Sequence, residues 1–340
     1  MSRRVLIPPT LPRSLPLGGG HAARAIWDFG GTTMGTYWRA RVVEPDRLTR
    51  DDAEKIVRDT LAFVVARMSP WEPDSDLSRF RSARAGEWTP LDPHTFRVLS
   101  RALEIAELTY GHYDPTIGRL TDALGFGPGD PALAVLPDSP RATEARALIH
   151  HRRVQLDPAR HAVLQPGGVQ LDLCSIAKGY AVDLVIERLQ SADTLSCFVE
   201  IGGESRGIGC KPDGQPWWCR LESSADAART LPPTVAAACD LAIATSGNTL
   251  RKRLLPDGRE LGHIVDPLRN DPPSPTLESV TVLAPTCIDA DAFATALFLL
   301  GSREGCRFAE QHDLAALFVE RTPPAGYREH WSPRFAAFLE

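Results

Sequence analysis

The order of strand-like and helix-like segments constrains the fold of this chain more than any other feature of its sequence. Alternating apolar and polar residues over 36–43 (TYWRARVV) predict a strand. Thr49 and Asp52 stand in capping-box spacing before apolar residues at helical intervals, which predicts an amphipathic helix that ends near residue 68. An Asp-Pro pair at the start of 92–109 predicts a second helix, because an N-cap acid followed by proline is a common helix start.

The later segments continue in an irregular order. They are a loop over 125–140, a helix over 176–189, strands over 195–201, 237–245 and 277–284, a proline-rich loop over 269–276, a helix over 289–301, and a further helix and strand near the C-terminus. Because the strands are grouped between helices without a regular βαβ rhythm, we expect an α+β fold and not a doubly wound sheet. Residues 1–25 are expected to be an irregular leader and 326–340 a C-terminal tail.

Composition excludes several classes of protein. The chain has 340 residues, of which 43% are hydrophobic and 24% charged, as is typical of a globular protein with one large domain or two closely packed ones. The net charge is −5 without a long run of Lys or Arg, which argues against a nucleic-acid-binding protein with a basic face. The most apolar stretch, 292–300, in which Thr295 is the one polar residue, is far shorter than the ~20 residues that a membrane-spanning helix requires.

The N-terminus and the cysteines bear on location. Four prolines interrupt the first twenty residues, whereas a signal peptide needs an unbroken apolar segment of roughly 7–15 residues. The seven cysteines all lie from Cys174 onward, so none stands near the N-terminus as a site for lipidation. They contain no C-x-x-C pair, which argues against a disulfide framework and a structural zinc site. We therefore expect reduced thiols and a cytoplasmic location.

A cluster of small residues precedes the helix predicted over 176–189. In DLCSIAKGY, residues 172–180, Lys178 and Gly179 stand at the helix start, where exposed backbone amides suit an anionic ligand. The pattern matches neither of the two standard glycine-rich nucleotide loops. Taken alone, Lys178 fits a solvated helix residue equally well.

Asp291 and Thr295 are four residues apart and therefore share one face of a predicted helix. A single carboxylate beside a hydroxyl suits Mg²⁺, which keeps several waters and takes other ligands from phosphates. The pair fits equally well a surface acid and a threonine bonded to its own helix. The segments 111–116 (GHYDPT) and 262–267 (GHIVDP) each place a histidine near an Asp-Pro turn, and such residues are more often structural than catalytic.

Eight sequence blocks nevertheless form a consistent set. They are MGTYW (34–38), MSPWEPDSDLSRF (68–80), GHYDPTIGRL (111–120), LDLCSIAKGYAVD (171–183), FVEIGGESRGIG (198–209), ATSGN (244–248), GHIVDP (262–267) and VTVLAP…DADAFATALFLLG (280–301). In order and approximate spacing, over about residues 30–320, the set resembles the FAD:protein FMN transferase family, the ApbE-type flavin transferases.

The resemblance implies an activity and a fold. Members of the family bind FAD and Mg²⁺, cleave the pyrophosphate, attach the FMN half to a threonine or serine hydroxyl of an acceptor protein, and release AMP. The fold would be α+β with mainly antiparallel sheets, and residues 26–325 would form one domain whose two lobes hold FAD between them.

The resemblance also assigns residues. Asp291, Thr295 and the carbonyl of Ala177 match the metal-binding positions, and Asp291 is expected to be essential for catalysis. His263 is the first candidate for the general base, with His112 second. The positions that match the FAD pocket are Met34, Trp71, His112, Tyr113, Asp114, Cys174, Lys178 and Val265.

Several positions depart from the family pattern. Trp71 stands where tyrosine is frequent, which keeps stacking but removes a phenolic hydrogen bond. Arg81 replaces a common asparagine, Cys174-Ser175 replaces a pair that is often Gly-Gly, and Gly247-Asn248 replaces Gly-Asp.

Two other functions are compatible with the same residues. One is an Mg²⁺-dependent FAD pyrophosphatase, in which water replaces the acceptor hydroxyl. The other is an FAD-binding protein without turnover, against which the preserved pair Asp291 and Thr295 argues. The identity of the acceptor is not encoded in this chain.

Overall fold

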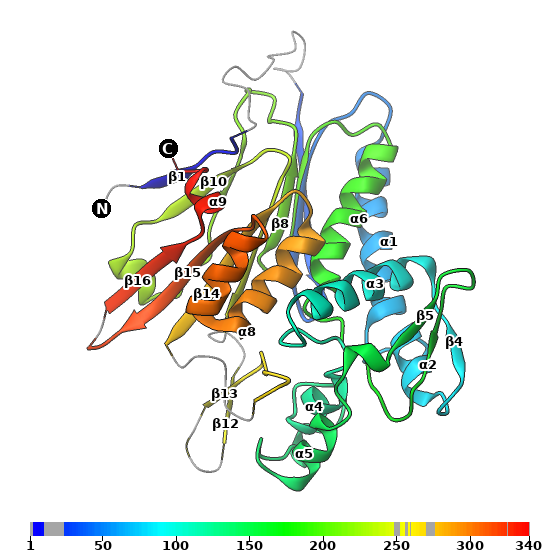
Figure 1. Ribbon diagram of the computed structural model, residues 1–340. Coiled ribbons are helices and arrows are strands. Elements are labelled where there is room, and N and C mark those ends of the chain that lie inside the picture. The colour runs from blue at the N-terminus through cyan, green and yellow to red at the C-terminus, as the bar shows by residue number, and fades with distance from the viewer. Residues whose placement is uncertain are drawn as a thin grey trace.

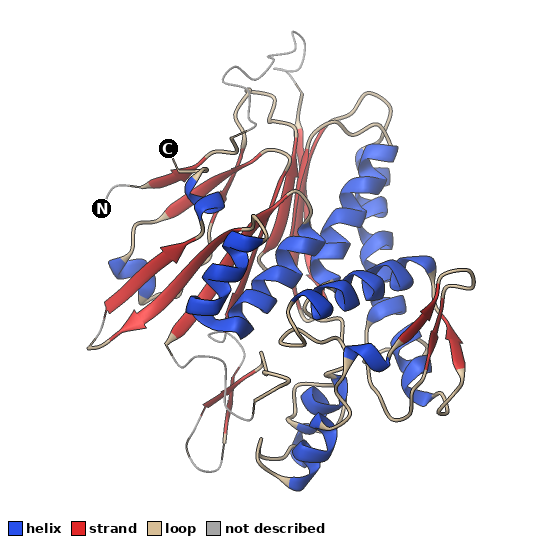
Figure 2. Cartoon of the chain, viewed as in Figure 1, coloured by secondary structure: helices blue, strands red, loops and turns tan. Residues whose placement is uncertain are grey.

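A central antiparallel sheet organises the molecule. The computed structural model describes residues 3–9, 24–247, 252–255, 258, 260–269, 276–324 and 326–339. Within these residues, eight strands pair in the order β16-β15-β14-β11-β8-β7-β3-β2, every neighbouring pair antiparallel (Figures 1 and 2). The strands are β2 (Ile26–Thr33), β3 (Thr36–Val43), β7 (Cys197–Ile201), β8 (Glu204–Ile208), β11 (Leu241–Gly247), β14 (Leu277–Ala284), β15 (Ala315–Thr322) and β16 (Gly326–Trp331). The predicted α+β class is confirmed.

Three long helices cover one face of this sheet. They are α1 (Arg50–Met68), α6 (Ala177–Ser191) and α8 (Cys287–Gln311), which Figure 1 shows side by side. On β14, Val280 and Val282 face the core under these helices, whereas Leu283 belongs to a second core on the opposite face. Because both faces are covered, β14 is buried along its whole length, including the polar residues Glu278, Ser279 and Thr281.

A second, three-stranded sheet covers the opposite face. Its order is β1-β10-β9, with β1 (Arg4–Leu6), β9 (Trp217–Arg220) and β10 (Thr234–Ala238), and the short helix α9 (Pro333–Ala336) packs beside it. The irregular leader and tail expected from the sequence therefore contain ordered elements, because Arg4–Leu6 pair with β10 and residues 326–336 form β16 and α9. A three-residue strand carries no periodicity of its own, and its partner lies 230 residues away.

Two other predicted elements differ in extent. The strand predicted over 237–245 is two strands in different sheets, because the chain reverses at Asp240, whose φ is 50°. The helix predicted over 289–301 continues as α8 to Gln311 through a break at Gly301, whose φ is 79°. The strand over 36–43, the helices near 50–68, 93–108 and 177–191, and the strand near 197–201 are confirmed within a few residues.

A smaller lobe lies below the large sheet in Figure 1. Helices α4 (Gly118–Ala123) and α5 (Pro140–Arg146) share a core with Leu255, Leu261 and Val265, which lie on and beside the hairpin β12 (Lys252–Leu254) and β13 (Glu260–Gly262). The remaining elements are α2 (Asp76–Ser82), α3 (Pro93–Leu108), α7 (Ala227–Thr230), the 3-10 turns Pro131–Leu133 and His151–Arg153, and the sheet β4-β6-β5 (Trp88–Pro90, Ala162–Leu164, Gln155–Asp157).

The predicted loop over 125–140 is irregular apart from one 3-10 turn. Most of the proline-rich loop over 269–276 lies outside the described residues.

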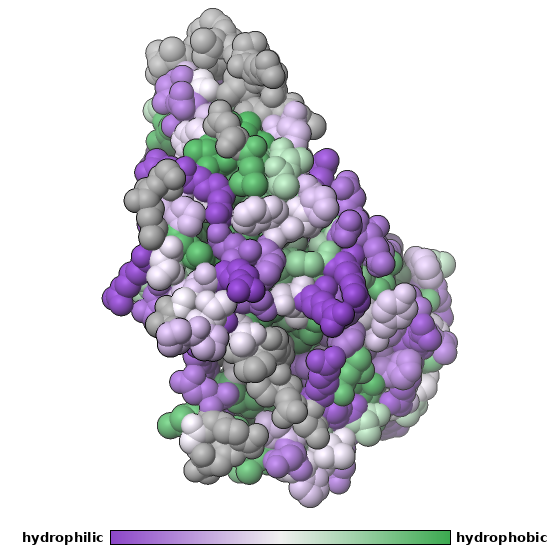
Figure 3. Space-filling model, turned by 60° about the vertical axis from the view of Figure 1, so that its left-hand side comes forward, coloured by the Kyte–Doolittle hydropathy of each residue, from purple (hydrophilic) through white to green (hydrophobic). Residues whose placement is uncertain are grey.

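Hydrophilic residues spread between smaller apolar groups over the face drawn in Figure 3. Among the described helices, none combines the length and the apolar character needed to cross a membrane.

Candidate active site

A cavity of about 1630 Å³ brings together residues from distant parts of the chain. Its walls come from the β2–β3 turn, the end of α1, the start of α6, the β7–β8 turn, strand β9, the end of β11, the segment after β13, and α8. Of the site residues expected from the sequence, all but His112 line it: Met34, Trp71, Tyr113, Asp114, Cys174, Ala177, Lys178, His263, Val265, Asp291 and Thr295.

Asp291 lies where the first turn of α6 packs directly against α8. Gly179, in the first turn of α6, has no room for a side chain, because a Cβ there would lie 2.2 Å from the Cys287 carbonyl oxygen. The Gly179 N–H donates a 2.9 Å hydrogen bond to Asp291 Oδ2. The Asp291 side chain is buried, and burial raises the pKa of its carboxyl group. Glycine is therefore needed for this helix contact, and the contact positions the carboxylate.

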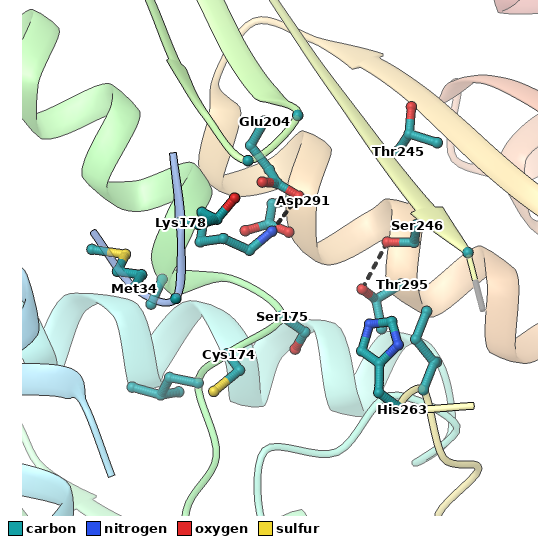
Figure 4. Close-up of a pocket in the computed structure, with 18 of the residues that line it drawn as sticks. Met34, Cys174, Ser175, Lys178, Glu204, Thr245, Ser246, His263, Asp291 and Thr295 are labelled. Carbon is teal, nitrogen blue, oxygen red and sulfur yellow. Dashed lines mark hydrogen bonds and ion pairs between the residues drawn. The ribbon is translucent and has the colours of Figure 1, made fainter. Parts of the chain in front are cut away.

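Lys178, Glu204 and Asp291 form a cluster of charges in which the two carboxyl groups are buried and the lysine is partly buried (Figure 4). The Lys178 ammonium is ion-paired with Glu204. Burial lowers the pKa of Lys178, but the two carboxylates outweigh that effect and raise it above its ordinary value. Burial also raises the pKa of Glu204 to about 8, against the opposing effect of Lys178. The cluster thus holds one ammonium group for two carboxyl groups.

Glu204 was not predicted from the sequence. It stands directly after the Gly-Gly turn of the block FVEIGGESRGIG, so a polar residue at that turn was the available signal. Its Oε2 is buried and has no hydrogen-bond partner among the described residues.

Thr295 lies one turn after Asp291 on α8, and its hydroxyl is 3.0 Å from that of Ser246 at the end of β11 (Figure 4). His263 and Val265 follow β13 and line the same cavity. Among the described residues, no group of three or more His, Cys, Asp or Glu side chains could hold a metal ion.

A metal held by mixed oxygen donors nevertheless fits. The carbonyl of Ala177, the carboxylate of Asp291 and the hydroxyl of Thr295 are the hard-oxygen donors that Mg²⁺ prefers. All three residues line the cavity. A divalent cation at Asp291 would also supply the positive charge that the cluster of Lys178, Glu204 and Asp291 lacks.

Aromatic and apolar groups form other parts of the wall. Met34 and Gly35, with φ of 49° and 72°, form the two-residue turn between β2 and β3, a geometry typical of a type I′ turn. Trp71 follows α1 and is 48% exposed. Tyr113 is buried, and its hydroxyl accepts a 3.2 Å hydrogen bond from Ser175 in the loop before α6.

The carboxylate of Asp114 is occupied by structural contacts. Its Oδ1 accepts hydrogen bonds from the backbone N–H and the hydroxyl of Thr116, at 2.8 and 2.7 Å, and its Oδ2 accepts one from the backbone N–H of His151 at 2.9 Å. Asp114 therefore holds the cavity wall in place. His112 does not line the cavity; its Nδ1 is buried without a partner among the described residues, and burial lowers its pKa.

Comparison with known proteins places the chain. The ApbE family model matches residues 34–318, which is most of the length of this chain. The chain belongs to the ApbE family. A protein of Vibrio cholerae named FAD:protein FMN transferase is 32% identical over 314 residues, 92% of each chain. A protein of the same name from Haemophilus influenzae is 30% identical to this chain. The alignment covers 91% of this chain and 90% of the Haemophilus influenzae protein.

Solved ApbE structures share the fold as well. The flavinyl transferase ApbE of Pseudomonas stutzeri superposes with a TM-score of 0.83 at 29% identity, over 93% of this chain and 97% of its own. The flavin transferase ApbE of Vibrio cholerae superposes with a TM-score of 0.83 at 31% identity, over 93% of this chain and all of its own.

The departures from the ApbE pattern fall in different places. Trp71 and Cys174-Ser175 line the cavity, whereas Arg81 lies exposed near the end of α2 and does not. Asn248 lies outside the described residues.

Proposed function

We propose that this protein transfers the FMN moiety of FAD to a threonine or serine hydroxyl of an acceptor protein, with Mg²⁺ and with release of AMP. The observation that carries the proposal is the buried carboxylate of Asp291, one helical turn from Thr295 and against the start of α6. The names of the relatives support the flavin substrate and the protein acceptor. The magnesium, the acceptor hydroxyl and the AMP product are part of the proposal.

The metal would be held by Asp291, Thr295 and the Ala177 carbonyl. Bound there, Mg²⁺ would neutralise the pyrophosphate and stabilise the charge of the departing AMP. The start of α6 would also stabilise the negative charge of the pyrophosphate. No side chain caps it, and a 15-residue helix presents positive partial charge at its N-terminus. Lys178 adds an ammonium, although Glu204 already neutralises much of its charge.

The cavity provides room for both substrates. Its volume of about 1630 Å³ exceeds the ~300–1,000 Å³ of a typical small-molecule pocket. Trp71 offers an aromatic face to a ring of FAD, with Met34, Cys174 and Val265 as apolar contacts. We expect FAD to bind more tightly than FMN, because only FAD carries the pyrophosphate and the adenine. Equal affinities in a calorimetric titration with Mg²⁺ would count against this assignment of the pocket.

His263 is proposed as the general base. It lines the cavity with Thr295, and an imidazole titrates close enough to neutral pH to take a proton from an acceptor hydroxyl. We do not propose His112, the second candidate from the sequence, because it does not line the cavity.

The test is FMN transfer measured over a Mg²⁺ titration. The full-length protein is incubated with FAD and a candidate acceptor protein, and mass spectrometry distinguishes FMN bound to a threonine or serine from free FMN. Free FMN in the presence of a competent acceptor would favour the pyrophosphatase, and intact FAD would favour a binding protein without turnover.

Asp291→Asn should lower the rate of transfer by several orders of magnitude, because it removes the one ionised protein ligand of the metal. The matched control is Asp289→Asn on the same helix. The Asp289 carboxylate is ion-paired with Arg101 at 2.7 Å, and the residue does not line the cavity. A near-normal rate and unchanged Mg²⁺ dependence for Asp291→Asn would refute the metal site.

The cytoplasmic location stays a prediction, to be tested by cell fractionation.

A further inference from the structure

Two thiols meet where the large and small sheets join. Cys210 follows β8 of the large sheet, and Cys239 follows β10 of the small sheet. Their Sγ atoms are 3.5 Å apart, and Cys239 Sγ is also 3.3 Å from the Gly209 carbonyl oxygen. Neither Cys210 nor Cys239 is in a disulfide in the structure. Cys210 and Cys239 stand 29 positions apart, so their spacing in the sequence did not indicate a pair.

The backbone around these thiols is held on both sides. A Cβ on Gly207 of β8 would lie 2.1 Å from the carbonyl oxygen of Ala238, so the two sheets are in direct contact beside the cysteines. The Trp217 indole N–H lies 3.1 Å from both the Ser196 hydroxyl and the Ile208 carbonyl oxygen, and anchors the start of β9 to the large sheet. The two sulfur atoms are therefore kept in contact by packing that does not involve the thiols themselves.

The segment between the two cysteines carries part of the active-site wall. It contains β9, α7 and β10, and residues 218–224 line the cavity. A covalent link between Cys210 and Cys239 would close this segment into a loop and tie its two ends to the joint between the sheets.

We propose that Cys210 and Cys239 are a site of reversible disulfide formation, oxidised by small-molecule disulfides such as oxidised glutathione. The bond requires the sulfur atoms to approach by about 1.5 Å, to a length of ~2.05 Å. This proposal is independent of the proposed function, because it concerns the fold of the cavity wall and not the reaction.

The reaction has two exchange steps. Cys210 loses its proton to solvent, and its thiolate attacks one sulfur of oxidised glutathione, which forms a mixed disulfide and releases one glutathione thiol. The thiolate of Cys239 then attacks Cys210 Sγ, the protein disulfide forms, and the second glutathione leaves with the proton of Cys239. Two protein thiols are oxidised by two electrons, and one small disulfide is reduced to two thiols.

Burial sets the order of the two thiols. Cys210 is half-buried, whereas Cys239 is buried. Burial, together with the neighbouring Cys210 thiol, raises the pKa of Cys239 to about 12. Because the small-molecule disulfide must reach the attacking sulfur, the more exposed Cys210 reacts first and the buried Cys239 resolves the mixed disulfide.

The experiment uses the full-length protein in glutathione buffers of increasing oxidised fraction, followed by non-reducing peptide mapping and thermal unfolding. We expect one peptide pair joined through Cys210 and Cys239, a mass lower by two hydrogens, and a melting temperature several degrees higher that returns to its starting value on reduction. Cys239→Ser should accumulate glutathione on Cys210, and Cys239→Ala gives the same readout if the serine variant does not fold. Cys306→Ser is the matched control and should still form the link.

Three outcomes would overturn the proposal. They are glutathione that stays on Cys210 in the wild-type protein, a link from either cysteine to another thiol such as Cys219, and two thiols that remain unreacted in a folded, fully oxidising sample.

Discussion

Substitution of Gly179 by alanine tests whether the contact between α6 and α8 positions the site. The added Cβ would lie 2.2 Å from the Cys287 carbonyl oxygen and 2.7 Å from Asp291 Cβ, where ordinary contacts are 3.4 Å or longer. The neighbouring atoms include backbone and cannot rotate away. The two helices must therefore separate locally by about 1 Å.

The expected magnitude follows from three contributions. Overpacking of this kind costs about 1–3 kcal/mol of unfolding free energy. Separation of the helices also weakens the 2.9 Å bond from the Gly179 N–H to Asp291, and a hydrogen bond to a charged group is worth about 1.5–3 kcal/mol. The higher helix propensity of alanine returns at most about 1 kcal/mol. We expect a net loss of about 2–4 kcal/mol.

Activity should fall as well, since Asp291 moves with α8. A displacement near 1 Å at a catalytic group can reduce the rate about 100-fold. The assay combines urea unfolding with FMN transfer over a Mg²⁺ titration, and Gln190→Ala, an exposed position on α6, is the control. Normal stability and a normal Mg²⁺ dependence in Gly179→Ala would show that the helices are not in the contact described here.

Three further outcomes are expected. Asp183→Ala should lower the unfolding free energy by about 3–5 kcal/mol in urea unfolding, because the buried Asp183 carboxylate accepts two backbone hydrogen bonds at the start of α8 and pairs with the partly buried Arg206 at 2.7 Å. A loss below about 1 kcal/mol would mean that Asp183 contributes no more than an exposed ion pair does. Burial holds the pKa of His112 below its ordinary 6.5, so the unfolded chain takes up the proton first and stability should fall as pH drops below 6.5. His112→Asn should flatten that pH dependence of the unfolding free energy, and an unchanged slope would assign it to other groups. Trp71→Ala should weaken FAD binding about tenfold by calorimetry without a change in stability, since the side chain is 48% exposed at the cavity wall; unchanged affinity would remove Trp71 from the binding surface.

Local structure was largely determined by the sequence alone. The helix at Arg50–Met68 begins where Thr49 caps the Asp52 N–H, and the strand at Thr36–Val43 has the bounds that its alternation predicted. Asp291 and Thr295 share a helical face because their spacing matches the helical period. These features depend on residues within a turn or two of one another, and propensity and periodicity describe such neighbours well.

Tertiary structure alone decided the rest. The start of α8 has no cap from its own Thr286, and Asp183 supplies two acceptors from 104 residues away. Glu204 meets Lys178 only because the β7–β8 turn faces the start of α6, and Arg4–Leu6 become a strand only beside β10. Each of these contacts joins segments that are far apart in the sequence, and the residue pattern of neither segment indicates the other. Their energies come from burial and hydrogen bonding that exist only once the sheets and helices have packed, so no local pattern in the sequence records them.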